Sequence, residues 1–124
     1  MNDAIELWRE RLGAKPGTTE ETPFGPQALV YKVAGKMFAL LMTDRSPLGI
    51  NLKCDPQQAL IIRATFSAVT PGYHMNKKHW NTIDLEAGLD TELVQSWIDD
   101  SYDLVKSKLP KAVQARLSHD GDKE

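Results

Sequence analysis

The chain has 124 residues, of which 41% are hydrophobic and 26% charged, and its formal net charge is −2. This composition is that of a single folded domain, and it excludes a disordered chain and a membrane-embedded one. The acidic balance argues against nucleic-acid binding by the whole surface, although it leaves room for a local basic patch.

The N-terminal sequence and the cysteine count both indicate a cytoplasmic protein. The first residues lack the basic region and apolar run of a secretory signal, and the apolar stretch 37–42 is too short to cross a bilayer. One cysteine, Cys54, has no second thiol with which to form an internal disulfide. We therefore expect a cytoplasmic chain that makes no contact with a membrane.

The first half of the chain predicts one helix followed by several strands. Ile5, Trp8 and Leu12 recur at helical spacing, and Gly13 is a natural end for that helix. The continuous apolar run 37–42 is typical of a central strand covered on both faces. Alternating or continuous hydrophobic residues predict strands over 28–33, 37–42 and 49–54. A short, polar, edge-like strand is expected at 18–22.

The middle of the chain predicts a helix and a final pair of strands. Asp55 can cap free helix amides and Pro56 suits the first helical position, so we expect a helix from there to about Phe66. Two further strands are expected at 72–75 and 80–85, and the residues between them would form a hairpin turn.

The last third predicts the longest helix. Asp90 or Thr91 caps its start, an apolar stripe follows, and Pro110 stops it. Residues 111–117 can add a short helical turn. Residues 118–124 are polar and have no apolar anchor, so we expect a disordered C-terminal tail there.

Runs of strands between helices predict an α+β fold. The expected order is one helix, three or four strands, one helix, two strands and one helix, which gives a single-layer antiparallel sheet packed with helices. Residues 1–117 would make up this single domain. We expect it to be a monomer or a weak oligomer.

The segment 71–81 is the most distinctive part of the sequence, because it combines basic, aromatic and amide side chains. Lysines neutralise phosphates, and aromatic rings and amides contact bases or sugars, so on a hairpin this segment would form a projecting basic wing. The structural alternative is a solvated turn whose tryptophan packs into the core and whose lysines keep a sheet edge soluble. The candidate site residues are His74, Asn76, Lys77, Lys78, His79 and Trp80.

The spacing of possible catalytic or metal-binding groups favours neither chemistry. His74 and His79 do not share a helical face, would lie on opposite sides of a strand, and have no nearby Cys or Glu to complete a metal site. Cys54 continues the alternation of Ile50 and Leu52, which indicates a core position. A reactive thiolate at a helix start is the alternative. We therefore expect no catalytic residue, no metal and no cofactor.

Residues 71–82, PGYHMNKKHWNT, resemble the signature block of the MmcQ/YjbR family of small bacterial proteins. The resemblance implies a compact α-β(3)-α-β(2)-α fold similar to that of secretion chaperones and of the frataxin homologue CyaY. It also implies a double-wing DNA-binding motif, and it brings no established catalytic activity. It covers about residues 1–117, with further similar segments at 22–25, 29–33, 35–39, 51–56, 97–102 and 109–111.

This resemblance makes a non-enzymatic DNA-binding module the leading functional prediction. Lys77 and Lys78 would contact phosphates, and His74, Asn76 and Trp80 would contact bases. The likeness to secretion chaperones favours a protein-interaction module instead, which would need an exposed apolar patch or sheet edge. A third hypothesis, a small-molecule binder or enzyme that uses His74 or His79, would need a concave pocket beside those residues.

Overall fold

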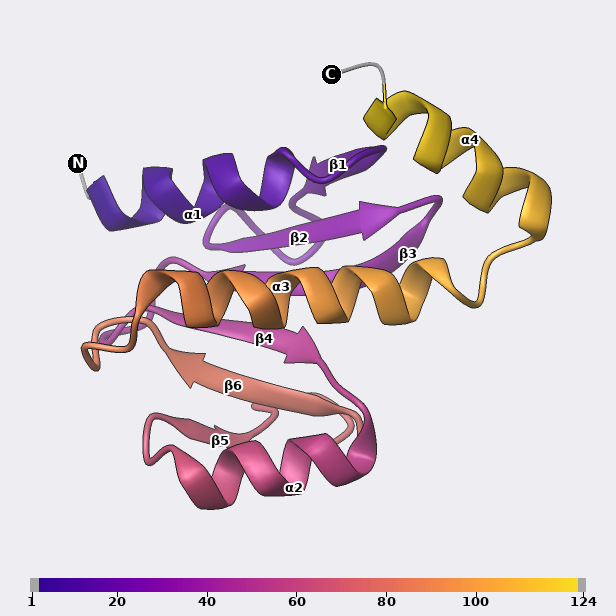
Figure 1. The fold of residues 1–124 in the computed structure, drawn as a ribbon. Coiled ribbons are helices and arrows are strands. Elements are labelled where there is room, and N and C mark those ends of the chain that lie inside the picture. Colours follow the sequence, from indigo (N-terminus) through magenta and orange to yellow (C-terminus); the bar gives the residue numbers. More distant parts are fainter. Residues whose placement is uncertain (1–2, 123–124) are drawn as a thin grey trace.

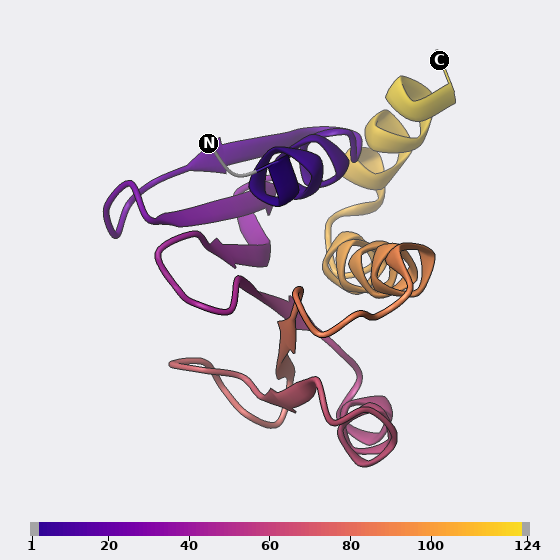
Figure 2. The same ribbon diagram turned by 90° about the vertical axis from the view of Figure 1, so that its left-hand side faces the viewer.

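Helices cover one face of a six-stranded antiparallel sheet in the computed structural model, which describes residues 3–122 (Figure 1). Figure 2, which looks along the strands, shows α2, α3 and α4 on the same side of the sheet. The elements are α1 (Asp3–Gly13), β1 (Thr18–Glu21), β2 (Ala28–Val33), β3 (Lys36–Met42), β4 (Gly49–Lys53), α2 (Pro56–Thr65), β5 (Val69–Pro71), β6 (Trp80–Asp84), α3 (Thr91–Lys106) and α4 (Lys111–Asp122).

The strand order β1-β2-β3-β4-β6-β5 confirms the predicted α+β fold with a single antiparallel sheet. The first run contains four strands, and β6 pairs with β4 while β5 lies outside it at the edge. The helix starts are as expected: Asp55 accepts hydrogen bonds from two backbone amides of α2, and Asp90 caps α3. No helix within residues 3–122 is long and apolar enough to span a membrane.

The last hairpin differs from the prediction, which placed a strand at 72–75. The strand is instead β5, three residues earlier, and residues 72–79 form a loop. β5 ends in a proline, which is tolerated because the side of an edge strand that faces solvent needs no backbone N–H for pairing. Gly72 extends the pairing by donating its N–H to the Trp80 carbonyl at 2.8 Å. A Cβ at position 72 would lie 2.7 Å from Cβ of Trp80, so the close approach of the two chains requires glycine.

The C-terminal helix is longer than the predicted turn at 111–117. α4 begins after Pro110, whose carbonyl accepts hydrogen bonds from the amides of Val113 and Gln114. Leu117 of this helix is buried. The helical backbone continues to Asp122, past the expected end of the domain. Residues 123 and 124 lie outside the described residues, and the disorder of the tail stays a prediction.

The hydrophobic core lies between the sheet and the helices. Phe38 is completely buried, and its ring meets Tyr102 of α3 edge-on with the centroids 5.3 Å apart. Burying a side chain of this kind stabilises a protein by about 1.5–3 kcal/mol. Other buried members from the sheet and the helices are Trp8, Leu12, Leu29, Tyr31, Val33, Leu41, Ile50, Leu52, Ile83, Ile98 and Val105.

A β-bulge in β3 is joined to α3 by one serine. The register of β2 and β3 shifts between Tyr31 and Lys32, which leaves Phe38 without a partner on β2. Ser101 is fully buried, and its hydroxyl donates to the Phe38 carbonyl at 2.6 Å while it accepts from the Lys53 amide at 2.8 Å. The serine thus satisfies two backbone groups that the sheet leaves unpaired.

Among the described residues, no helix lies on the opposite face of the sheet (Figure 2), so the expectation that 37–42 is covered on both faces is wrong. Leu40 of β3 lies beside Asn51 of β4, and Asn51 lies beside Thr82 of β6, so the three share this face. Leu40 is only half-buried, whereas Asn51 and Thr82 are buried. We call this surface the open face, and a loop covers part of it.

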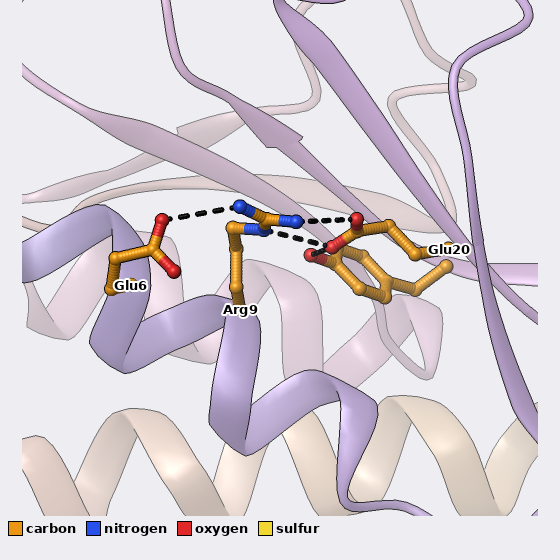
Figure 3. Close-up of polar contacts among 4 residues, drawn as sticks. Glu6, Arg9 and Glu20 are labelled. Carbon is orange, nitrogen blue, oxygen red and sulfur yellow. Dashed lines mark hydrogen bonds and ion pairs between the residues drawn. The ribbon is translucent and has the colours of Figure 1, made fainter.

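At the β1 edge of the sheet, an ion-pair network connects α1 to β1 (Figure 3). Arg9 donates through Nη2 and Nε to the two carboxylate oxygens of Glu20, at 2.8 and 3.0 Å, and its Nη1 lies 3.1 Å from Glu6. The Tyr31 hydroxyl also donates to Glu20. The hydrogen bond from Arg9 is the main cause that lowers the pKa of Glu20, against partial burial, which raises it.

This network predicts a pH dependence of stability. Because the pKa of Glu20 is lower in the folded state, its contribution is complete above the unfolded value near 4.5 and is lost as the pH falls through the folded pKa. Glu20→Gln should therefore reduce the loss of unfolding free energy between pH 7 and pH 3, measured by urea denaturation. Glu10→Gln, an exposed neutralisation on α1, serves as the control and should leave that loss unchanged.

Candidate functional site

Residues 72–79, the β5–β6 loop, fold back over the open face, and Figure 2 shows them on the side of the sheet away from α2. The Tyr73 carbonyl accepts from Asn51 Nδ2 at 3.1 Å, and the Tyr73 amide donates to Thr82 Oγ1 at 2.8 Å. Thr82 Oγ1 in turn donates to Asn51 Oδ1 at 2.5 Å. Asn51 is 0% exposed and Thr82 2%, so a buried polar network holds the loop on the sheet.

The base of the loop is held by Arg63 in the last turn of α2. Its Nε donates to Asn81 Oδ1 at 2.6 Å, and its Nη2 donates to the carbonyls of Trp80, at 3.2 Å, and Lys77. Within the loop, Lys77 Nζ donates to the Gly72 carbonyl at 2.9 Å. Sequence reasoning missed Arg63, because its partners lie at least 14 residues further along the chain and no local pattern marks them.

The structure places most of the predicted site residues on the outside of this loop. His74, Asn76, Lys77 and Lys78 are exposed, and His79 is half-buried. The backbone of His74 is left-handed, with φ 57°, and its ring lies 4.0 Å from that of Tyr73. The exception is Trp80, which lies on β6 and is 8% exposed. It pairs with Lys53 and so shares the open face with Asn51 and Thr82, outside the buried cluster between the sheet and the helices that the structural alternative expected. A role of Trp80 in ligand contact stays a prediction.

Four cations gather around the loop. Lys53 lies opposite Trp80 at the end of β4, and Arg63 contacts the loop that carries Lys77 and Lys78. Among the residues that the structure describes, none of the four cations has a carboxylate within 4.0 Å. This region is therefore basic although the chain as a whole is acidic.

The surroundings of Cys54 argue against a reactive thiolate. Partial burial raises the pKa of its thiol, and the carboxylates of Asp55 and Asp100 raise it further. A thiol with a raised pKa is a poor nucleophile at neutral pH. Within the described part of the chain, no three His, Cys, Asp or Glu side chains are grouped to hold a metal ion.

A groove of about 700 Å³ lies on the open face beside the β5–β6 loop. The loop forms one wall, and the connections β1–β2 and β3–β4 form the others. The hypothesis of a small-molecule binder required a concave pocket beside His74 or His79, and His74 lines this groove. Its floor on β3 was not foreseen, because the apolar run of β3 was expected to be covered on both faces. The floor is made by Ala28, Met37, Leu40 and Met42, and the walls by Phe24, Gln27, Asp44, Arg45, Tyr73, His74 and Met75.

Comparisons with known proteins show that the chain is similar to several bacterial proteins. Residues 13–104 match the family model described as YjbR. The chain is similar to the "Uncharacterized protein YbdF" of Escherichia coli O157:H7, with 41% identity over 95 residues that cover 77% of this chain and 78% of the relative. It is also similar to the "Uncharacterized protein YjbR" of Escherichia coli K12, with 31% identity over 98 residues that cover 79% and 83%.

Two crystal structures show the same fold. The protein DR2400 of Deinococcus radiodurans, with the domain DUF419, has a TM-score of 0.83 and 33% identity, over 92% of this chain and 87% of that one. A protein of Pseudomonas syringae has a TM-score of 0.72 and 29% identity, over 84% and 98%. The sequence and structural similarities therefore agree with each other over most of the chain.

Proposed function

The chain belongs to the YjbR family, and from this premise we propose that it is a non-enzymatic module that binds DNA through the β5–β6 loop. The observation that carries the proposal is the group of cations around the loop, which have no carboxylate partner among the described residues. Phosphates are the ligands that such a group attracts.

Four exposed side chains of the loop have a role in this proposal. Lys78 Nζ contacts one phosphate. Lys77 contacts a second, because its ammonium group has three donors and uses one of them on Gly72. His74 and Asn76 meet a sugar or a base edge. The net negative charge of the remaining surface repels DNA and confines the contact to the loop.

The double variant Lys77→Ala/Lys78→Ala tests this function. We expect its affinity for a short DNA duplex at low salt to fall about tenfold or more, and the slope of log K against log salt to become shallower by about 2. Fluorescence anisotropy of a labelled duplex across a salt series measures both quantities.

The matched control is Lys108→Ala/Lys111→Ala, which removes the same charge from exposed positions after α3 and at the start of α4. It should bind nearly as well as the parent. Unchanged binding by the loop variant, or equal weakening by the control, would refute a loop-centred contact.

One observation favours the protein-interaction alternative. Leu60 and Ile61 project from α2 with exposures of 63% and 57%, which is unusual for adjacent large apolar side chains. A partner seated there would not sense the charge of Lys77 and Lys78. The same loop variant therefore separates the two functions, because only the DNA-binding function is lost with these lysines.

A further inference from the structure

The groove on the open face is an apolar surface with no occupant in the fold. Its volume, about 700 Å³, is within the range of small-molecule sites. Met37, Leu40 and Met75 are half-buried there, and flexible methionine side chains adapt to the shape of a ligand. On the walls, Phe24 is 69% and Tyr73 52% exposed. Large apolar side chains left open around one hollow are typical of a binding site.

Arg45 is an exposed residue at the rim of this groove. Its side chain lies across Gly49, where an added Cβ would be 3.3 Å from Nη1 and 3.4 Å from Cδ. Its Cζ lies 5.3 Å from the centre of the Tyr73 ring. The guanidinium group is thus packed between the sheet backbone and an aromatic ring, and within residues 3–118 no carboxylate lies within 4.0 Å of it.

The other polar groups of the groove limit the charge of a ligand. Asp44 lines the groove beside Arg45, so a second anionic group on a ligand would meet a carboxylate. The His74 ring and the Gln27 amide supply further hydrogen-bonding groups. Both side chains are exposed, but the Arg45 guanidinium also lies against the Tyr73 ring, whereas Asp44 forms no ion pair among the described residues. The favoured ligand therefore carries one anionic group, at Arg45, and an apolar body.

We propose that this groove binds a small apolar carboxylic acid. Its carboxylate is held by the planar fork of Arg45, which matches the two oxygens of a carboxylate. Its hydrocarbon or aromatic body lies on Leu40, Met42 and Met75, against Tyr73. This site shares His74 with the proposed DNA contact but none of its cations, and its occupation requires neither Lys77 nor Lys78.

The test compares two probes that share one ring system. 8-Anilinonaphthalene-1-sulfonate is an apolar anion, and N-phenyl-1-naphthylamine is the same amine without the sulfonate; both fluoresce more strongly in apolar sites. Arg45→Gln should weaken binding of the anionic probe about tenfold or more, because hydrogen bonds to a charged group are lost. Binding of the neutral probe should weaken by less than about twofold. Decanoate should displace the anionic probe from the parent, and decanol should displace it less.

Two further variants make the result specific. Asp44→Asn removes the neighbouring negative charge and should strengthen binding of the anionic probe. Arg45→Lys keeps the positive charge but lacks the planar fork of arginine. Its affinity for the anionic probe should lie between those of the parent and of Arg45→Gln. Near-ultraviolet circular dichroism checks that each variant keeps the packing of the parent, as expected for exposed positions.

Several results would overturn the proposal. Arg45→Gln could bind the anionic probe as tightly as the parent, or it could lose both probes equally, which would mean that no anionic group is recognised. Sedimentation could instead show a dimer that Phe24→Ser dissociates, which would make a second copy of the chain the occupant. Lys78→Ala should bind the anionic probe like the parent, so failure of the DNA proposal would leave this one standing.

Discussion

Replacing Phe38 with alanine is expected to lower the free energy of unfolding by about 3 to 5 kcal/mol. The side chain is completely buried, and its removal opens a cavity against Tyr102 and the centre of the sheet. A domain of this size is stable by only about 5–15 kcal/mol, so the variant loses a large share of the total. Urea denaturation at pH 7, followed by tryptophan fluorescence, measures the difference.

The control for this variant is Phe24→Ala, the same substitution at a position that is 69% exposed. It should change the unfolding free energy by no more than about 0.5 kcal/mol. Equal losses at the two positions would show that the core is not centred on Phe38.

The second large effect is expected from Asn51→Ala, which should cost about 2 to 4 kcal/mol, because it leaves two groups in a buried network without partners. The Tyr73 carbonyl loses the amide that donates to it, and the Thr82 hydroxyl loses its acceptor. The β5–β6 loop should then open more often, which faster hydrogen exchange of the Tyr73 amide reports. Since this loop forms one wall of the groove, binding of the anionic probe should weaken as well.

A double-mutant cycle with Thr82→Ala separates the network from a general loss of packing. The double variant should cost less than the sum of the two single variants, by about 0.5 kcal/mol or more. Additive losses would mean that the two residues stabilise the fold independently and that the loop is held by other contacts.

The elements of the fold follow from local patterns in the sequence, and for that reason they could be predicted. The alternation in β2 and β4 and the Asp55-Pro56 start of α2 depend on residues that are close together in the chain. The resemblance of residues 71–82 to a family block was confirmed by the family match.

The site depends on contacts between distant residues, which local patterns do not encode. Alternation puts Asn51 on the polar side of β4, yet it is 0% exposed, because a loop more than twenty residues later covers it. For the same reason, the sequence did not decide on which face of the sheet Trp80 lies. A pocket beside His74 was one hypothesis, but its apolar floor on β3 was not predicted, because an apolar strand has the same sequence whether its second face is covered by a helix or lies open to a ligand.

Both outer strands of the sheet are poor templates for a further strand. β1 is four residues long and includes the charged Glu20 and Glu21, and β5 has three residues and ends in Pro71, which has no N–H to offer. Acidic side chains and proline at such positions prevent chains from joining edge to edge. This protein should therefore resist assembly by strand addition, so its partners have to approach through the open face, the β5–β6 loop or the helices.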